Sequence, residues 1–580
     1  MLKTLGRETK GFRLVSVLTP VFMIAEVIME MIIPRLMASI IDNGVTPGNM
    51  QVIYTVGAQM IVAALFGLLF GILGAVAGSH AATGFARNLR RAMFRNIQTF
   101  SFANIDKYST AGLVTRMTTD VTNIQNAYQM LLRMSIRAPA SMIVALIMSF
   151  AINRELASVY LVAVILLGGA LVFIMSRATK YFGEAFRKYD DLNESVQENV
   201  SAIRVVKAYV REDFEGKKFK KASENVRRLL MRAEMILAWN APLMQLTVYS
   251  CILLISWLGA QLIVSSGATV FTTGDLMSML SYCMNILMSL MMLSMVFVMI
   301  TMSAASAKRV AEVLDEQSDL KNGEDPVMEV KDGSVKFDHV SFAYKKDGKK
   351  ALEDIDLEIK SGETIGIIGG TGSSKSTLIQ LISRLYDATE GAVRVGGVDV
   401  RGYDLEALRD QVAVVLQKNV LFSGSIRENL RWGNKDATDA EMEEACRLAQ
   451  ADEFIRQFPD GYDTHIEQGG ANVSGGQKQR LCIARALLKK PKILVLDDST
   501  SAVDTRTDAL IRQALRRYIP ETTKIIIAQR IASVQDADRI VVMDGGAVNA
   551  VGTHAELMKT NKIYREVYTS QNKAGDDDAE

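Results

Sequence analysis

Long apolar runs fill the first three hundred residues of the chain, and short alternating runs follow them. Six of the long runs approach the roughly twenty residues that a helix needs to cross a bilayer. They cover residues 14–41, 52–78, 138–150, 157–174, 243–264 and 276–301, of which the third is the shortest and has the least defined ends. This pattern predicts an α-helical six-span transmembrane domain over residues 1–315.

Basic residues predict how these spans are oriented. Four Lys and Arg residues precede the first span, and the stretches 87–137 and 177–232 are rich in both. The connections 42–51 and 265–275 contain neither. Under the positive-inside rule the basic stretches are cytoplasmic and the two connections face outward. Both termini are therefore expected in the cytoplasm, and the first span, which lacks a cleavage-site pattern, is expected to stay in the mature protein.

The two cytoplasmic stretches have the composition of helices that continue the spans below the bilayer, since residues 192–230 contain few helix breakers. Turns are expected around 109–116 and 209–214. We expect these turns to contact the part of the chain that follows the spans, because two domains that work together need a mechanical connection. The alternative is a solvated charged helix without that contact.

The pattern changes after the sixth span. Residues 316–334 are polar and include Gly323 and Pro326, which predicts a linker. Alternation then predicts strands at 335–342 and 355–359, and an apolar run predicts a buried strand at 365–370. A soluble domain is thus expected over 335–570, followed by an acidic polar tail over 571–580.

Composition narrows the class of protein. The chain has 580 residues, which is long for one domain, and 49% of them are hydrophobic. The net charge of +2 gives no reason to expect a nucleic-acid partner. The four cysteines, Cys251, Cys283, Cys446 and Cys482, show neither paired nor metal-ligand spacing, so reduced thiols are expected.

A phosphate-binding loop, GGTGSSKST, occupies residues 369–377 between the buried strand and a predicted helix, which is the context that this motif requires. Its backbone amides around Gly372 would cradle phosphate oxygens, Lys375 would reach the terminal phosphates and Ser376 would coordinate Mg²⁺. Ser374 stands where the usual pattern has glycine, and its side chain either weakens ATP binding or adds a donor. The loop residues expected to bind ATP are Gly370, Thr371, Gly372, Ser373, Ser374, Lys375, Ser376 and Thr377.

Two acidic residues end a second apolar strand at 493–496. Asp497 is placed to hold the metal, and Asp498 would polarise the attacking water. Aspartate is one methylene shorter than the glutamate expected there, and catalysis is sensitive to displacements of about 1 Å. Gln529 follows the strand 524–528, where a histidine is expected, and its amide donates a hydrogen bond but carries no proton. Both changes predict a site that binds ATP better than it cleaves it.

These motifs, with VSGGQ at 473–477, resemble those of the ATP-binding cassette transporters, specifically an exporter half-transporter with the membrane domain ahead of an α/β P-loop ATPase domain. The resemblance covers the whole chain. It implies that Tyr344 stacks on adenine and that Gln417 links the metal to the membrane helices. It also implies that the signature residues cap the ATP of the opposite subunit, and that the SAVD loop at 501–504 crosses the dimer interface. The signature residues are Ser474, Gly475, Gly476 and Gln477, after a Val473 that replaces the customary leucine.

The pair Asp498 and Gln529 resembles the degenerate-site subunit of heterodimeric bacterial multidrug exporters. That resemblance implies a second half-transporter with an intact catalytic glutamate and histidine, ATP and Mg²⁺ as cofactors, and a small amphipathic substrate. It places the chain in the bacterial cytoplasmic membrane as a multi-pass protein. One site of such a dimer turns ATP over and the other mainly clamps.

Other functions stay open. Within transport, the alternatives are a dedicated lipid or peptide exporter or flippase, and a homodimer. An ATP-gated channel would use clamping without net transport. A soluble cassette that acts on nucleic acid is disfavoured by the six spans.

Two sets of residues in the spans are candidates for substrate contact. Met288, Met292, Met295 and Met299 recur at helical spacing, which suits either an adaptable apolar pocket or ordinary helix packing. Glu26 and Glu30 lie about one turn apart within the first span, where a carboxylate is costly. They either form a hydrogen bond to a neighbouring helix or contact a cationic substrate.

Overall fold

The computed structural model describes residues 1–345 and 348–577, without the side chains of residues 186, 190 and 572–577. The chain forms two compact units. Unit 1 comprises Met1–Thr99 and Tyr108–Gln317, and unit 2 comprises Phe100–Lys107 and Ser318–Glu580. The linker expected at 316–334 belongs to unit 2 from Ser318 onward, and its Val330 is buried in that unit's core.

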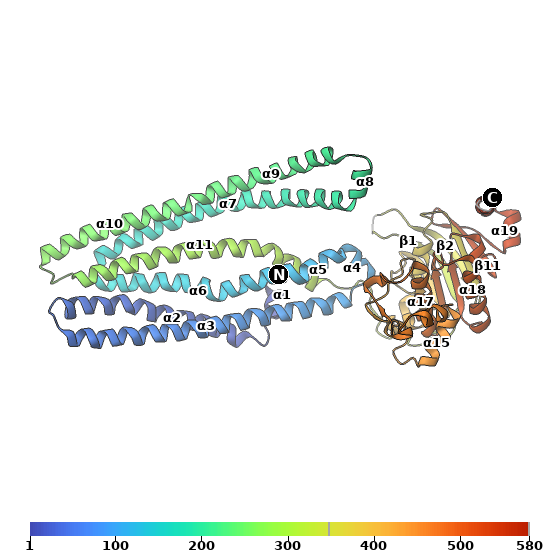
Figure 1. Ribbon diagram of the computed structural model, residues 1–580, viewed down its shortest axis with the longest axis horizontal. Helices are drawn as coiled ribbons and strands as arrows, with labels where there is room; N and C mark the ends of the chain where they lie inside the picture. Colours follow the sequence, from blue (N-terminus) through green and yellow to red (C-terminus); the bar gives the residue numbers. More distant parts are fainter. Residues whose placement is uncertain (346–347, 578–580) are drawn as a thin grey trace. The chain divides into compact units, whose positions relative to one another are not determined.

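Unit 1 is helical, and the described residues contain six helical segments that are long and apolar enough to cross a membrane. Each one includes one of the six runs predicted from the sequence, so the six-span expectation is confirmed. Figure 1 shows them as long, roughly parallel rods. The helices of unit 1 are α1 (Leu2–Arg7), α2 (Arg13–Ile40), α3 (Met50–Gln98), α5 (Thr110–Thr115), α6 (Val121–Ile152), α7 (Arg154–Ser201), α8 (Ile203–Ala208), α9 (Glu212–Ala238), α10 (Asn240–Ser266) and α11 (Thr273–Asp315).

Most spanning helices continue well beyond their apolar runs. The short third run, 138–150, is only the end of α6, because the first half of that helix mixes apolar residues with polar ones and with Arg133. Helices α7 and α9 pack along each other and are joined through α8, as Figure 1 shows. The turn between α7 and α9 therefore lies at residues 202–211 and overlaps the start of the second expected turn, 209–214.

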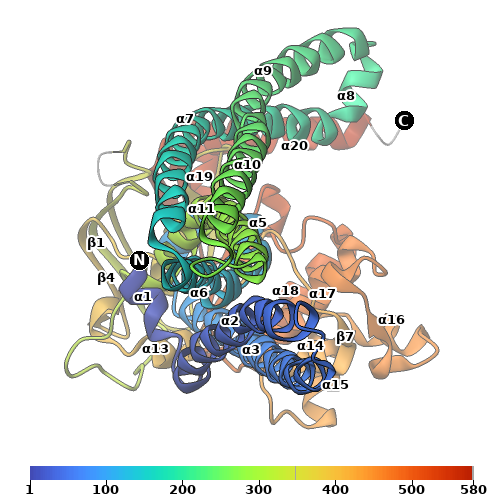
Figure 2. The same cartoon turned by 90° about the vertical axis from the view of Figure 1, so that its left-hand side faces the viewer.

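Glycines on α3 let α2 pack against it closely. A Cβ atom added at Gly74 would lie 2.4 Å from the Met23 methyl carbon, and one at Gly71 would lie 3.2 Å from the Glu26 carboxyl carbon. Small residues at such positions allow helix backbones to approach and gain van der Waals contact. The first two spans thus form a tight hairpin, visible as the blue pair in Figure 2.

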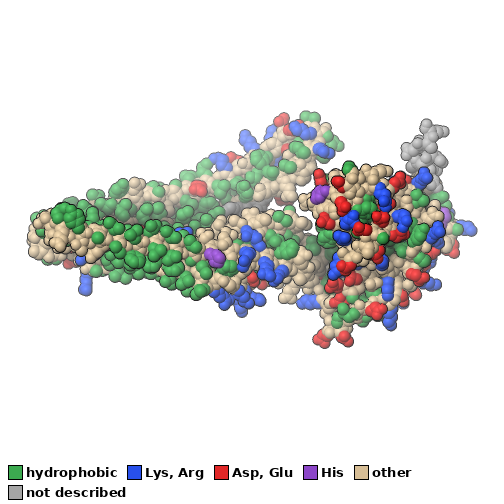
Figure 3. All heavy atoms as spheres, turned by 60° about the horizontal axis from the view of Figure 1, so that its bottom comes forward, with side chains coloured by type: hydrophobic (Ala, Val, Ile, Leu, Met, Phe, Trp, Pro, Cys, Tyr) green, Lys and Arg blue, Asp and Glu red, His purple; other side chains and the backbone are tan. Residues whose placement is uncertain are grey.

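The outer surface of unit 1 is apolar. Trp257 is 76% exposed and Val264 is 83% exposed, and many other large hydrophobic side chains lie on the same helices. On the face drawn in Figure 3, hydrophobic side chains cover one part of the helical unit and Lys and Arg gather on another part. Helices that are apolar outside as well as inside match a lipid environment.

The turn that follows α3 differs from the expectation of 109–116. It lies earlier, at α4 (Phe102–Lys107), which groups with unit 2. There the Tyr386 hydroxyl donates a 2.6 Å hydrogen bond to the Asp106 carboxylate, and burial raises the pKa of Tyr386. The expectation failed because Ser109 starts a helix instead of a turn, since its hydroxyl accepts a hydrogen bond from the Gly112 amide and caps α5.

Unit 2 is an α/β domain built on two main sheets. The larger has the order β12-β11-β3-β10-β9-β6, in which all neighbours are parallel except β11 and β12. The smaller has the order β2-β1-β4-β5 and is antiparallel. The strands of unit 2 are β1 (Val335–Phe342), β2 (Leu352–Ile359), β3 (Thr364–Gly369), β4 (Glu390–Val395), β5 (Val398–Asp399), β6 (Val412–Val415), β9 (Ile493–Asp497), β10 (Thr523–Ile527), β11 (Arg539–Asp544) and β12 (Ala547–Gly552), with a short pair β7 (Gly424–Ser425) and β8 (His465–Ile466).

The strand predictions agree with this architecture. Strands β9 and β10 are buried at every position, and each contains a run of three or four consecutive apolar residues, as is typical of strands covered on both faces. The main helices around them are α12 (Lys375–Ile382), α13 (Leu405–Gln411), α14 (Ile426–Arg431), α15 (Asp439–Leu448), α16 (Asp452–Gln457), α17 (Gly475–Leu488), α18 (Thr505–Tyr518), α19 (His554–Thr560) and α20 (Lys562–Asp577). Helix α20 runs through residues 571–577, where the sequence predicted a polar tail.

Candidate nucleotide-binding site

The predicted ATP-binding residues gather at the carboxyl ends of neighbouring parallel strands. The phosphate loop follows β3, Gln529 comes just after β10, Asp497 ends β9, and Gln417 comes just after β6. These four strands are consecutive in the large sheet, in the order β3-β10-β9-β6. Ligands of open α/β sheets bind at this edge, so the topology assembles one site from segments far apart in the sequence.

The phosphate loop wraps around the Lys375 ammonium group. That group donates hydrogen bonds to the carbonyls of Gly369 at 2.7 Å and Gly370 at 2.9 Å, and to the Ser373 hydroxyl at 3.2 Å. Burial lowers the pKa of Lys375 from its usual value. The lysine and the N-terminus of α12 direct positive charge into the loop, which is the electrostatic requirement for binding phosphate.

Tyr344 lies beside this loop. Its hydroxyl is 2.8 Å from the Thr377 hydroxyl, and half of the residue is exposed. The exposed ring at the edge of the phosphate site is in a suitable place to stack on a base.

Ser374 adopts a left-handed backbone conformation, with φ of +67°. This finding adds a second reason for the glycine that the usual motif has there. A residue with a Cβ atom costs about 1 kcal/mol in this conformation, whereas glycine adopts it freely. The substitution therefore places backbone strain directly at the start of α12.

The donor set for a metal is made of oxygen atoms. The Ser376 hydroxyl lies near the Asp497 carboxylate, which is only 5% exposed, and burial raises the pKa of Asp497. Gln417 follows the adjacent strand, β6. One hydroxyl, one carboxylate and one amide oxygen suit Mg²⁺, which takes few protein ligands and completes its shell with phosphate oxygens and water. Ser376, Asp497 and Gln417 would hold the ion, which would neutralise phosphate charge.

The two altered catalytic residues contact each other. The Gln529 side-chain amide donates a 2.8 Å hydrogen bond to the Asp498 carboxylate. Asp498 has a left-handed backbone with φ of +48°, held by a hydrogen bond from its amide to the Ile527 carbonyl. Aspartate tolerates this conformation better than most residues. One carboxylate oxygen of the residue expected to polarise water is thus bonded to a neutral side chain of the same site.

The signature forms the start of a helix. Ser474 is the N-cap of α17: its hydroxyl accepts from the Gln477 amide, and the Gln477 side chain accepts from the Ser474 amide. Such a capping box leaves the serine hydroxyl able to donate. The amides of Gly475 and Gly476 lie in the first turn, where they have no intrahelical partner. The signature thus presents several donors to an anion.

The signature and the SAVD loop of this chain are joined. A Cβ atom added at Gly476 would lie 2.8 Å from the Ala502 carbonyl oxygen, so the second signature glycine is required for this approach. The buried Gln479 accepts from the Ala502 amide and donates to the Ser501 hydroxyl. Sequence reasoning missed Gln479, whose only sequence cue is its place on the buried face of a helix that starts at the signature.

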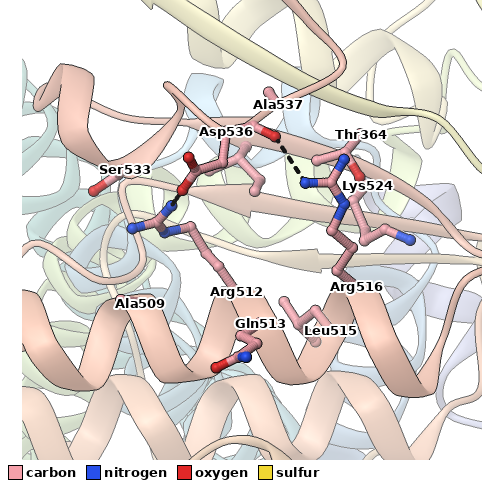
Figure 4. A pocket seen from close by; sticks show the side chains of 11 residues that line it. Thr364, Ala509, Arg512, Gln513, Leu515, Arg516, Lys524, Ser533, Asp536 and Ala537 are labelled. Carbon is pink, nitrogen blue, oxygen red and sulfur yellow. Dashed lines mark hydrogen bonds and ion pairs between the residues drawn. The ribbon is translucent and has the colours of Figure 1, made fainter.

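A separate cavity of about 300 Å³ lies between α18 and the segment that follows Gln529 (Figure 4). Arg512 and Arg516 reach into it from α18. Arg512 pairs with Asp536 at 2.7 Å and Arg516 pairs with Asp538 at 3.0 Å. Its lining includes none of the predicted ATP-binding residues, and its two arginines are bound to carboxylates of this chain.

The candidate substrate residues have different surroundings. Arg137 of α6 binds Glu26 at 2.6 Å and Glu30 at 2.9 Å, so both carboxylates of α2 share one cation. Met288 and Met295 are 56% and 64% exposed. A mostly apolar pocket of about 350 Å³ between α7 and α11 is lined by other residues, among them Leu171, Met175, Leu290, Ser294 and Phe297.

Comparison with known proteins agrees with this arrangement. The family model described as ABC transporter transmembrane region matches residues 17–291, and the model described as ABC transporter matches residues 352–501. The chain is 35% identical to the uncharacterized ABC transporter ATP-binding protein YfiB of Bacillus subtilis (strain 168), over 97% of each protein. It is 31% identical to the probable multidrug resistance ABC transporter ATP-binding/permease protein YheI of the same organism, over 98% of this chain and 97% of that protein.

Among solved structures, a bacterial Atm1-family ABC exporter with ATP bound superposes with a TM-score of 0.80 and 26% identity, over 98% of both chains. The match includes the helical unit and the ATPase unit in the same order along the chain. The chain therefore belongs to the ABC transporter family, as an exporter half-transporter that works as a dimer in the membrane and couples ATP hydrolysis to transport.

Proposed function

We propose that this chain is the catalytically impaired subunit of a heterodimeric exporter of amphipathic compounds. The observation that carries the proposal is the hydrogen bond between Gln529 and Asp498. A partner half-transporter with a glutamate and a histidine at these two positions would supply the competent site.

The chemistry of the pair accounts for a slow site. A carboxylate that activates water must accept its proton in the correct geometry, and aspartate is one methylene shorter than glutamate. Gln529 occupies one oxygen of Asp498 and has no proton to exchange between pH 4 and 10. ATP binding needs neither function, because Lys375, Ser376 and the loop amides provide it. The site then holds ATP and hydrolyses it slowly.

The complete signature has the opposite role. Its donors project from the start of α17, and its capping box is intact. In the proposed dimer these donors bind the ATP that the partner's phosphate loop holds. Lys375, Asp498 and Gln529 hold a second ATP against the partner's signature.

The substrate class rests on broader observations. The name of one relative describes it as a probable multidrug resistance transporter. The pocket between α7 and α11 is largely apolar, and adaptable apolar pockets suit amphipathic compounds. We place the chain in the bacterial cytoplasmic membrane with both termini inside, on the basis of the basic cytoplasmic stretches.

ATPase measurements on the purified chain test the proposal. Reconstituted alone in lipid nanodiscs, the chain is expected to bind ATP but to show little drug-stimulated hydrolysis. Adding the partner should restore turnover. A homodimer of this chain with robust drug-stimulated ATPase activity would overturn the heterodimer assignment.

Transport is tested separately with inside-out vesicles that contain both subunits. ATP-driven accumulation of an amphipathic dye against its gradient is expected. Equilibration that stops when the two compartments are equal would indicate a channel instead.

A further inference from the structure

Helix α20 reaches the segment that carries Gln529. The Gln571 side chain accepts a 2.9 Å hydrogen bond from the Ile531 amide and donates a 2.7 Å hydrogen bond to the Gln529 carbonyl. Both partners are backbone groups of the stretch between β10 and η6 (Ile531–Ser533), where strand pairing has ended. An amide side chain offers a donor and an acceptor together, so one residue satisfies both groups.

The first half of α20 is fixed to unit 2 by one apolar face. Tyr564 is fully buried, and Val567 and Tyr568 pack against the same hydrophobic cluster. Gln571 follows these residues at the spacing i, i+3, i+4 and i+7, which lies on one face of a helix. Packing of that face therefore delivers the Gln571 amide to residues 529–531.

The far end of the same segment is held differently. Ser533 donates a 3.0 Å hydrogen bond to the buried carboxylate of Asp508 on α18. Val534 is buried against β3, where an added Cβ atom at Gly366 would lie 2.6 Å from its own Cβ. The segment is thus anchored near Val534 and by the buried side chain of Ile531, whereas Gln529 itself is exposed.

We propose that Gln571 is a positioning residue of the ATP site: it holds the backbone of residues 529–531 so that the Gln529 side chain stays on Asp498. The C-terminal helix then sets how tightly this site retains its nucleotide. The inference deepens the proposal that the chain's own site clamps ATP, and it extends the site to a residue some forty positions beyond Gln529.

The bonds can be removed separately. Gln571→Ala removes both, whereas Gln571→Glu keeps an acceptor for the Ile531 amide and places a second acceptor against the Gln529 carbonyl. Ser570→Ala changes the neighbouring exposed side chain and serves as the matched control.

Hydrogen exchange on the full-length chain in nanodiscs measures how well the backbone amides of residues 529–531 are protected, and it needs no ATP turnover. Gln571→Ala should speed exchange in the peptide that contains Ile531 by about fivefold, as expected for the loss of one protecting hydrogen bond. Gln571→Glu should exchange at nearly the wild-type rate, and so should Ser570→Ala. An unchanged rate in Gln571→Ala, or equal acceleration throughout unit 2, would overturn the proposal.

Release of a fluorescent ATP analogue, measured by stopped flow on the same samples, tests whether Gln571 affects how tightly the site retains nucleotide. Gln571→Ala and Gln571→Glu should both release it about fivefold faster than the wild type, with Ser570→Ala unchanged. Faster exchange combined with unchanged release would show that Gln571 orders the loop without positioning Gln529, and would refute the inference. If the wild-type chain alone hydrolysed ATP rapidly, the clamp proposal would fail while the exchange result kept its meaning.

Discussion

The two nucleotide-facing regions of unit 2 differ in what their polar side chains are bonded to. On the phosphate-loop side, Asp498 is bonded to Gln529, and Ser374 is held in a left-handed conformation. On the signature side, Ser474 and the amides of Gly475 and Gly476 sit at a helix start with donors free to face an anion. Motif matching alone would score both sides as nearly complete.

This difference shows that the effect of an altered motif is best judged from the hydrogen bonds that the replacing residues make. Asp498 keeps the charge expected of its position but not its reach or its availability. The signature tolerates Val473 because an apolar swap changes no donor. Under the proposed function, the phosphate-loop side is a holding face and the signature side is an activating face.

The charged residues inside unit 1 are also best judged by their partners. Glu26 and Glu30 share one cation, Arg137, between α2 and α6. Among the described residues, Glu26 Oε2 and the Arg133 Nε atom, one turn before Arg137, are buried without a hydrogen-bond partner. The ion pair of Glu26 with Arg137 joins two helices, so it favours the helix-to-helix prediction for Glu26 over recognition of a cationic substrate.

The sharpest test of the two faces compares Ser474→Arg with Lys375→Ala in the heterodimer. Ser474→Arg should reduce steady-state ATPase activity at least about 100-fold, because it removes donors from the ATP that turns over. Lys375→Ala touches the chain's own slow site and should cost less. The opposite ranking would contradict the assignment of the faces.

The next largest effect is expected from breaking the ion pairs of unit 1. Arg137→Gln leaves two carboxylates without their cation inside the bundle and should lower stability by about 2 kcal/mol, seen as reduced expression and a lower melting temperature in detergent. Glu26→Gln should cost less, since Arg137 keeps Glu30. Arg154→Gln, at an exposed helix start, is the control.

Dye transport decides what Glu26 does. With a helix-to-helix role, Glu26→Gln should reduce transport of cationic and neutral dyes alike. Selective loss of cationic dyes, with basal ATPase activity intact, would instead assign Glu26 to the substrate.

Restoring the catalytic pair should convert the holding face into a second active one. The double change Asp498→Glu with Gln529→His is expected to raise turnover by this chain's own site by about tenfold, less than the roughly 100-fold or more that a general base typically contributes, because Asp498 already supplies a carboxylate. It is measured best with the partner's glutamate replaced, so that the background is low. Asp498→Ala in the unaltered heterodimer should change activity less than about threefold, and a loss equal to that caused by the partner's glutamate would show two equivalent sites.

The smallest effect concerns Ser374→Gly. Relief of the left-handed strain should stabilise unit 2 by less than about 1 kcal/mol, since glycine also loses more entropy on folding. ATP affinity should rise about twofold. Gln450→Gly relieves a similar conformation, with φ of +56°, and is the control: stabilisation without a change in affinity. Lower affinity in Ser374→Gly would mean that the serine hydroxyl contributes a donor to ATP.

The elements of both units followed from local patterns. Runs of apolar residues gave six spans, and the strand expected at 335–342 matches β1. The sequence also predicted that the motif residues form one site, and these residues do follow strands whose parallel order brings them together. The turn expected at 109–116 was wrong, since the capping role of Ser109 depends on which backbone amide its hydroxyl meets.

What the sequence by itself determined was composition along the chain: which segments are apolar, which end in glycine or acid, and which motif positions are altered. The partners of individual side chains were decided only by the tertiary structure, as with Glu26 and Arg137, which lie 111 positions apart, or Gln571 and the Gln529 carbonyl, 42 apart. The spacing of apolar residues along the chain indicates which face of an element is buried, because buried positions repeat with the period of the helix or strand. A hydrogen bond depends on a distance of about 3 Å between two atoms, which local sequence does not encode.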